Sequence, residues 1–195
     1  MFKFKSKEDV NKYLKICDKW CKRTKMSLEH DFIKKIIQKD VNNYIYVKED
    51  GKIKSKGAYV KDLSLIDNDL PIVNKAIKEK LINNIDVETT INNCNNLMDF
   101  QKCVKITGKY SHAVYGKEEI HLKVFRVFAS NYSGDNSIMK IKSDGRLEKI
   151  SYTPDKVFID NTKVINKEVP AKLDKSWYVK LAKDRLDSFM TEDSF

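Results

Sequence analysis

Hydrophobic side chains recur first at helical spacing and then at alternating spacing along the start of the chain. The first stretch predicts an amphipathic helix over residues 7–24, preceded by a capping box of Ser6 and Asp9. The apolar residues at helical spacing are Val10, Leu14, Cys17 and Cys21. Two strands are predicted next, over residues 28–38 and 43–47, because both stretches are rich in β-branched and aromatic side chains.

A hairpin turn is predicted directly after the second strand. Glu49-Asp50-Gly51 is a turn sequence of the kind that joins antiparallel strands. Residues 52–56 then alternate strictly between charged and uncharged positions. Lys52, Lys54 and Lys56 should therefore share one face of a third strand.

The middle of the chain has the pattern of short helices. A polar connector that contains Asp62, Asp67 and Asp69 leads to Pro71, a residue suited to the first position of a helix. The apolar stripe expected on this helix consists of Val73, Ala76, Ile77 and Leu81. Asp86 and Glu88 should open another short helix, which ends near residue 94, and a further turn is expected over residues 97–101.

The pattern changes to alternating, β-prone stretches from Cys103 onward. Strands are predicted over residues 103–106, 122–128 and 139–142, and Ser143-Asp144-Gly145 closes the last of them with a turn. A final helix should run from about Asp174 to Phe189. The residues in register along it are Tyr178, Ala182, Leu186 and Phe189.

These elements predict an α+β fold. We expect an N-terminal helix with a small antiparallel sheet over residues 1–66 and a helical block over residues 67–102. Residues 103–195 should form a β-rich segment that is closed by a helix.

Charge indicates a polyanionic partner. The 195 residues include 38 Lys and Arg against 28 Asp and Glu, for a formal net charge of +10. Most of the basic residues are lysines, which neutralise phosphates as point charges and do not read base edges as bidentate arginines do. No long apolar span or basic amphipathic helix with a clean apolar face is visible, so membrane binding is not expected. The charged start of the chain does not resemble a signal peptide, which predicts a cytoplasmic location.

Residues 39–61 have the composition of a nucleic-acid-binding surface. Lysines there are interleaved with tyrosines and asparagines, which combine charge for phosphates with hydrogen bonds and flat contacts for sugars and bases. The candidate binding residues are Asn42, Asn43, Tyr44, Tyr46, Lys52, Lys54, Lys56, Gly57 and Lys61. A second interpretation remains open: the lysines could belong to a solvated edge strand and simply discourage sheet-to-sheet aggregation.

Several strings of this sequence are similar to the region that follows the palm carboxylate motif in family B DNA polymerases of bacteriophages. The strings cover residues 39–45, 54–59, 67–73, 123–130, 153–158 and 173–183. The resemblance implies a palm end and thumb that hold a primer–template duplex from its minor-groove side, through Tyr44, Lys56 and Gly57. Asn42 and Asn43 stand where the wider family often has basic residues, so lysine contacts near the bases are not implied there.

Catalytic chemistry is not predicted. Nucleotidyl transfer by two metals needs paired carboxylates, and Asp67-Asn68-Asp69 before Pro71 is better interpreted as helix-entry capping. The cysteines and histidines lack the spacing of a zinc site, so no metal or cofactor is expected. Ser111-His112 and Glu118-Glu119 do not define a nucleophile with its base and are interpreted as surface residues.

Two functional hypotheses follow. The first is a non-catalytic protein that grips duplex DNA, or a DNA/RNA hybrid, beside a separate catalytic polymerase chain. The second is a phage anti-defence protein, for example a CRISPR-Cas inhibitor, that binds a nucleic-acid-guided nuclease or its guide RNA. Both place the protein in the cytoplasm of a phage-infected bacterial host.

Overall fold

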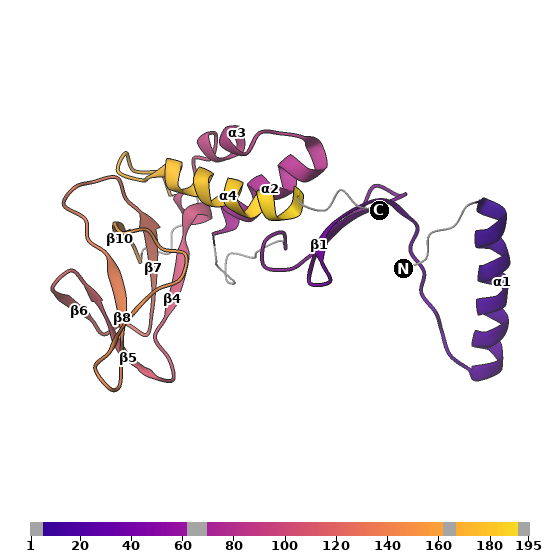
Figure 1. Cartoon of the computed structure of the whole chain (residues 1–195), viewed down its shortest axis with the longest axis horizontal. Coiled ribbons are helices and arrows are strands. Elements are labelled where there is room, and N and C mark those ends of the chain that lie inside the picture. Colours follow the sequence, from indigo (N-terminus) through magenta and orange to yellow (C-terminus); the bar gives the residue numbers. More distant parts are fainter. Residues whose placement is uncertain (1–5, 62–69, 162–166, 191–195) are drawn as a thin grey trace.

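Helices and antiparallel sheets alternate along the chain, which confirms the predicted α+β class (Figure 1). The computed structural model describes residues 6–61, 70–161 and 167–190. Its helices are α1 (Lys7–Thr24), α2 (Pro71–Asn83), α3 (Val87–Asn92), the 3₁₀ helix η1 (Leu97–Phe100) and α4 (Lys175–Met190). Its strands are β1 (Ile33–Asp40), β2 (Asn43–Lys48), β3 (Ile53–Lys56), β4 (Lys102–Lys105), β5 (Tyr110–Tyr115), β6 (Glu118–Ile120), β7 (Val124–Ala129), β8 (Ile138–Lys142), β9 (Leu147–Lys149) and β10 (Val157–Ile159).

The first sheet has the strand order β1-β2-β3 and confirms the predicted hairpin. β1 begins later than the predicted strand over residues 28–38. Ile33 pairs with Lys48, the last residue of β2, so residues before Ile33 have no strand residue of β2 beside them. The apolar side chains between residues 28 and 32 therefore lie in an extended segment and not in a ladder.

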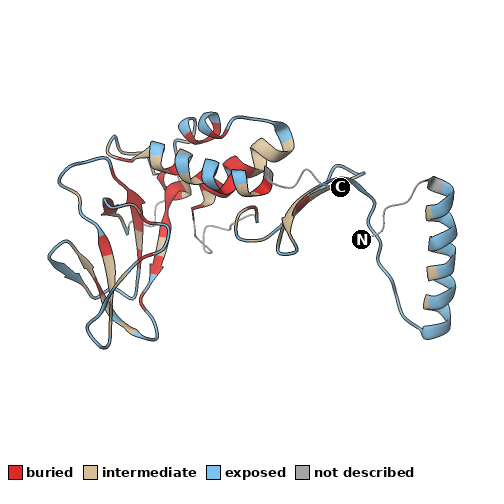
Figure 2. Ribbon diagram, viewed as in Figure 1, coloured by how far each residue is buried: buried red, intermediate tan, exposed pale blue. Residues whose placement is uncertain are grey.

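Residues of α2, α3 and α4 form much of the larger of two apolar cores, together with residues of β2, β7 and β10. Figure 2 colours the buried residues red. On α2 the predicted stripe is confirmed: Val73, Ala76 and Ile77 are fully buried, and Leu81 is partly buried and packs against the same core. All four residues expected in register on α4 are also buried. Pro71 is the first residue of α2, and Leu70 takes the N-cap position in a left-handed conformation. The expected capping by Asp67 and Asp69 lies outside the described residues.

The second core lies between two sheets of the β-rich part. One sheet has the order β10-β7-β4 and the other β6-β5-β8-β9. The buried residues that they share are Val104, Ile106, Ala113, Phe125, Val127, Ile138, Ile150 and Val157. The sequence pattern did not predict β5, β6, β9 or β10. Two of these strands, Glu118–Ile120 and Leu147–Lys149, are only three residues long and mostly polar, so they are defined by their partners more than by their own composition.

The Tyr178 hydroxyl links α4 to strand β7 and to the 3₁₀ helix η1. It accepts a hydrogen bond from the Ala129 N–H of β7 and donates one to the Phe100 carbonyl of η1, both at 2.9 Å. The ring also packs edge-on against Phe100, with centroids 5.0 Å apart. Burial raises the pKa of this phenol above its ordinary value, so the hydroxyl stays protonated and able to donate.

Replacing Tyr178 with Phe should destabilise the protein by about 1–3 kcal/mol, because a buried N–H and a buried carbonyl both lose their partner. The free energy of unfolding would be measured by urea denaturation followed by circular dichroism. Tyr132→Phe is the matched control, since the Tyr132 side chain is exposed and its change should stay within about 0.5 kcal/mol. Equal effects of the two substitutions would contradict the bridging role.

Candidate nucleic-acid interface

Two rows of side chains cross the outer face of the first sheet. One row runs through Gln38, Tyr44 and Lys56, which are direct neighbours on β1, β2 and β3. The second row runs through Ile36, Tyr46 and Lys54 in the same way. Directly opposite residues of antiparallel strands project on the same side, so four of the predicted binding residues share one face.

The buried neighbours of these residues determine which way they point. Ile45, between Tyr44 and Tyr46, is completely buried in the larger core, and Ile37 of β1 packs against the same core. Successive side chains in a strand point to opposite faces, so burying Ile45 turns both tyrosines outward. Lys35, on the inner side of β1, donates to the Leu81 carbonyl at 3.2 Å and ties the sheet to α2.

The tyrosine rings form a flat surface on the outer face. Tyr44 and Tyr46 stack with centroids 6.0 Å apart and ring planes 15° from parallel. The Lys54 ammonium lies 5.9 Å from the centre of the Tyr46 ring. This arrangement holds an aromatic platform beside cations, a combination that suits sugars and phosphates.

Acidic residues orient some of the lysines but not all of them. Asp31 accepts ion pairs from Lys48 at 2.6 Å and from Lys54 at 3.6 Å, and the bond from Lys48 is the main cause of its lowered pKa. The pKa of Lys54 is raised, first by its contact with the Tyr46 side chain and then by Asp31. Within the described parts of the chain, Lys56 and Lys61 have no carboxylate at ion-pair distance.

The turn between β1 and β2 uses both predicted asparagines for its own geometry. One oxygen of Asp40 accepts from the backbone N–H groups of Asn42 and Asn43 at 2.8 and 2.9 Å, and the Asn43 amide also donates to this carboxylate. The first of these bonds is the largest cause of the lowered Asp40 pKa. Asn42 remains exposed, whereas the Asn43 side chain faces inward, half-buried, and so contributes to the shape of the turn.

Gly57 fits closely against the same turn. Its φ is +108°, and a Cβ at this position would lie 2.3 Å from the Asn42 carbonyl oxygen. The Gly57 carbonyl accepts from the Lys61 N–H at 2.9 Å, and the Lys61 carbonyl in turn accepts from the Asn74 side chain of α2. Gly57 and Lys61 therefore lie in the loop after β3, beside the two rows. Lys52 lies at the hairpin end, where its exposed side chain pairs with Asp50 at 3.2 Å.

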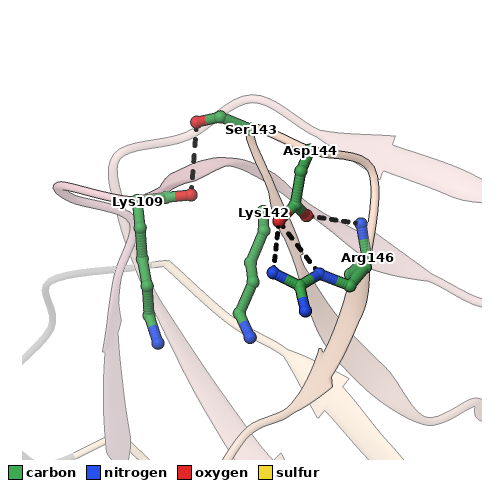
Figure 3. Close-up of a pocket in the computed structure, with 5 residues that line it drawn as sticks. All are labelled: Lys109, Lys142, Ser143, Asp144 and Arg146. Carbon is green, nitrogen blue, oxygen red and sulfur yellow. Dashed lines mark hydrogen bonds and ion pairs between the residues drawn. The ribbon is translucent and has the colours of Figure 1, made fainter.

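A second cationic cluster, which the sequence analysis missed, surrounds the β8–β9 turn (Figure 3). Its lining residues are Lys109, Lys142, Ser143, Asp144 and Arg146. The Arg146 guanidinium binds the Asp144 carboxylate with two N–H groups, at 2.6 and 2.9 Å. Glu148 pairs with Lys142 at 2.7 Å and with Lys109 at 3.4 Å. Each of the three cations therefore forms an ion pair with a nearby carboxylate. In the sequence, only the turn Ser143-Asp144-Gly145 pointed to this region.

The hairpin of β5 and β6 brings together the acid–base residues that the sequence separated. Ser111 Oγ lies 2.9 Å from His112 Nδ1, while Glu119 lies 3.0 Å from His121 Nε2 and 3.9 Å from His112 Nε2. Ser111, Glu119 and His121 are exposed to solvent. Among the residues that the structure describes, no three His, Cys, Asp or Glu side chains are grouped to hold a metal ion, and all four cysteines are free thiols.

Comparison with models of known protein families, with curated proteins and with solved structures finds no match to this chain. Across the described residues, none of the helices combines the length and the apolar character that crossing a bilayer requires.

Gly57→Ala should destabilise the protein more than Gly51→Ala does. Both glycines have positive φ, so each substitution costs about 1–2 kcal/mol of backbone strain. At Gly57 the added methyl would also clash with Asn42 and Asn43 in the β1–β2 turn, whereas nothing lies within 4 Å of a Cβ at Gly51. Urea denaturation would measure both variants. Similar losses of stability would show that the close approach at Gly57 contributes nothing.

The Glu148 carboxyl should titrate with a pKa of about 2, because Lys142, then Tyr110 and Lys109, hydrogen-bond its charged form. This pKa lies below the unfolded value, so the associated stabilisation is complete above about pH 4.3 and is lost as the pH falls toward 2. Lys142→Met should raise the pKa, as followed by carboxyl carbon NMR. Lys149→Met, which removes a lysine paired to Asp155 instead, should leave it unchanged.

Proposed function

We propose that this chain is a non-catalytic nucleic-acid-binding protein that holds the backbone of duplex DNA on the outer face of its first sheet. The observation that carries the proposal is the pair of cross-strand rows, in which stacked Tyr44 and Tyr46 stand directly beside Lys56 and Lys54. An edge strand that merely repels other sheets needs lysines, but it does not need them in register with stacked aromatic rings.

The spacing of these lysines suits a phosphate backbone. Lys54 and Lys56 are two residues apart on one strand, which separates them by about 6.8 Å. Phosphates of one DNA strand follow at about 3.4 Å along the helix axis, so the two ammonium groups can neutralise phosphates that are close together. Because lysines dominate and carry no bidentate geometry, binding should depend little on base sequence.

The resemblance to phage family B polymerases supports the same function. In that interpretation the chain acts as a thumb-like clamp in the cytoplasm of an infected bacterium and accompanies a catalytic chain that supplies the metal-binding carboxylates. Tyr44, Lys56 and Gly57 are the positions that carry the resemblance, and two of them lie in one of the cross-strand rows. Gly57, which packs closely against the β1–β2 turn, directly follows Lys56 of that row.

Replacing Lys52, Lys54 and Lys56 together with Gln should weaken DNA binding at least about tenfold at low salt. The slope of log K against log salt should also become shallower, by up to about 2.7 if each lysine contacts one phosphate. Fluorescence anisotropy with duplexes of unrelated sequence would measure both quantities. Single-stranded DNA and a DNA/RNA hybrid, measured alongside, would identify the preferred form.

The matched control replaces Lys105, Lys117 and Lys123, three exposed lysines of the β-rich part, with Gln. It removes the same net charge, so any effect of overall charge alone appears equally in both triple variants. Equal losses of affinity in the two variants, or no binding by the unmodified chain, would refute the proposed interface.

A further inference from the structure

One carboxylate pairs with two lysines of the proposed DNA-binding face. Asp31 binds the Lys48 ammonium through one oxygen at 2.6 Å and the Lys54 ammonium through the other at 3.6 Å. Lys54 belongs to the row that contains Ile36 and Tyr46. Lys48 lies two residues after Tyr46 on β2, so alternation along the strand places it on the same outer face. An anion of the protein itself therefore binds two cations that a phosphate of DNA would otherwise use.

Asp31 differs from the other acid at this end of the sheet in the groups that it holds. Asp50 accepts from the backbone N–H of Lys52 at 2.9 Å, and this bond is the largest cause of its lowered pKa, so Asp50 shapes the hairpin turn. For Asp31 the largest cause of the lowered pKa is the side-chain bond from Lys48. Replacing the Asp31 carboxylate should therefore release lysines without disturbing the turn.

The backbone beside Asp31 keeps its carboxylate close to the sheet. The Phe32 carbonyl accepts from the Glu49 N–H at 3.0 Å, just after the end of β2. The Asp31 side chain is 39% exposed, so it can turn into solvent while this backbone bond stays in place. A group tethered in this way competes with anions from solution at an effective concentration on the order of millimolar. A single free phosphate must exceed that concentration to displace it.

A chain of linked phosphates displaces such a carboxylate more easily than one phosphate does. Lys56 lies two residues from Lys54 on the same face, and among the described residues it has no carboxylate at ion-pair distance. Once Lys56 binds one phosphate of a DNA strand, the neighbouring phosphates are held near Lys54 and compete with Asp31 at high local concentration. Inorganic phosphate has no second attachment of this kind.

We propose that Asp31 is a specificity-determining residue, which occupies Lys48 and Lys54 until a polymeric phosphate displaces it, and that Lys48 is a further phosphate-binding residue of this face. The inference rests on the proposed DNA-binding function and adds selection to it: the face binds a duplex at concentrations where it rejects free phosphate. The same carboxylate lowers the affinity for DNA, because its negative charge stays close to the bound strand.

Asp31→Asn should bind duplex DNA at least about threefold more tightly than the unmodified chain at low salt, because two lysines are released to the phosphates. The slope of log K against log salt should become steeper by up to about 0.9. Asp155→Asn is the matched control, since it removes the same charge from a carboxylate that pairs with Lys149 in the β-rich part. Fluorescence anisotropy measures all three proteins. Equal affinities of the two variants, or weaker binding by Asp31→Asn than by the unmodified chain, would overturn the proposal.

The gain in affinity should depend on the two lysines that Asp31 holds. In a Lys48→Gln/Lys54→Gln background, Asp31→Asn should change the affinity no more than Asp155→Asn does, because neither ammonium group remains to be released. A gain of the original size in this background would show that Asp31 does not act through these lysines. In the Asp31→Asn chain, Lys48→Gln alone should weaken duplex binding at least about threefold. An unchanged affinity would exclude Lys48 as a phosphate-binding residue.

Titration with inorganic phosphate at pH 7 tests the selection without any DNA. The lowered pKa of Asp31 keeps its carboxylate charged under these conditions. NMR signals of the side-chain methylene groups of Lys48 and Lys54 should respond at several-fold lower phosphate concentration in Asp31→Asn than in the unmodified chain. Asp155→Asn should behave like the unmodified chain. The same phosphate affinity in all three proteins would overturn the selection by Asp31.

Two patterns of results separate this inference from the proposed function. If the triple lysine variant of β3 loses affinity for DNA while Asp31→Asn and Asp155→Asn bind it equally, the DNA-binding face is supported and the role of Asp31 is overturned. If neither the unmodified chain nor Asp31→Asn binds any duplex, the proposed function fails and this inference fails with it.

Discussion

The two hydrogen bonds of the Tyr178 hydroxyl fix the helix on which both halves of the fold depend. They join α4 to β7 and to η1 in a buried setting, where a missing partner is costly. Farther along α4, the Phe189 ring lies 6.5 Å from the Tyr59 ring, and Arg185 stacks between Tyr59 and Tyr152 at 5.0 and 4.7 Å. The same helix thus anchors the loop that follows the first sheet, and the position of that sheet follows from the docking of α4.

Burial on one side of β2 creates the candidate interface on the other side. Ile45 contributes to the core, and strand geometry then exposes its two tyrosine neighbours without any further constraint. Pairing with β3 brings Lys54 and Lys56 to the same face. The core contacts and the candidate interface therefore lie on opposite faces of the same three strands, so the outer side chains can change while the inner ones maintain the fold.

Helices and strands with a clear periodic pattern of hydrophobic residues were predictable from the sequence. Strands that form only because a distant strand lies beside them were not. The hairpin and the stripe of Tyr178, Ala182, Leu186 and Phe189 agree with the structure because local pattern and tertiary packing coincide there. The 7–24 helix agrees through its own periodicity and its Ser6 cap. Leu147–Lys149 is a strand only because Ile138–Lys142 lies beside it. The grouping of Tyr44 with Lys56 could be anticipated from alternation, whereas the internal use of Asn43 by Asp40 depends on turn geometry that composition does not reveal.

Net charge alone does not locate a binding surface on this molecule, since cations are distributed over both halves of the chain. The cluster around the β8–β9 turn is compensated by Asp144 and Glu148, so it presents little uncompensated field to a phosphate. At the first sheet, Asp31 pairs with Lys48 and Lys54 and Asp50 pairs with Lys52, while Lys56 lies beside Tyr44 without a carboxylate at ion-pair distance among the described residues. Within the described residues, register with an aromatic row and a lysine that has no carboxylate beside it are therefore the features that mark this face as the candidate, and the register follows from which residue of β2 is buried.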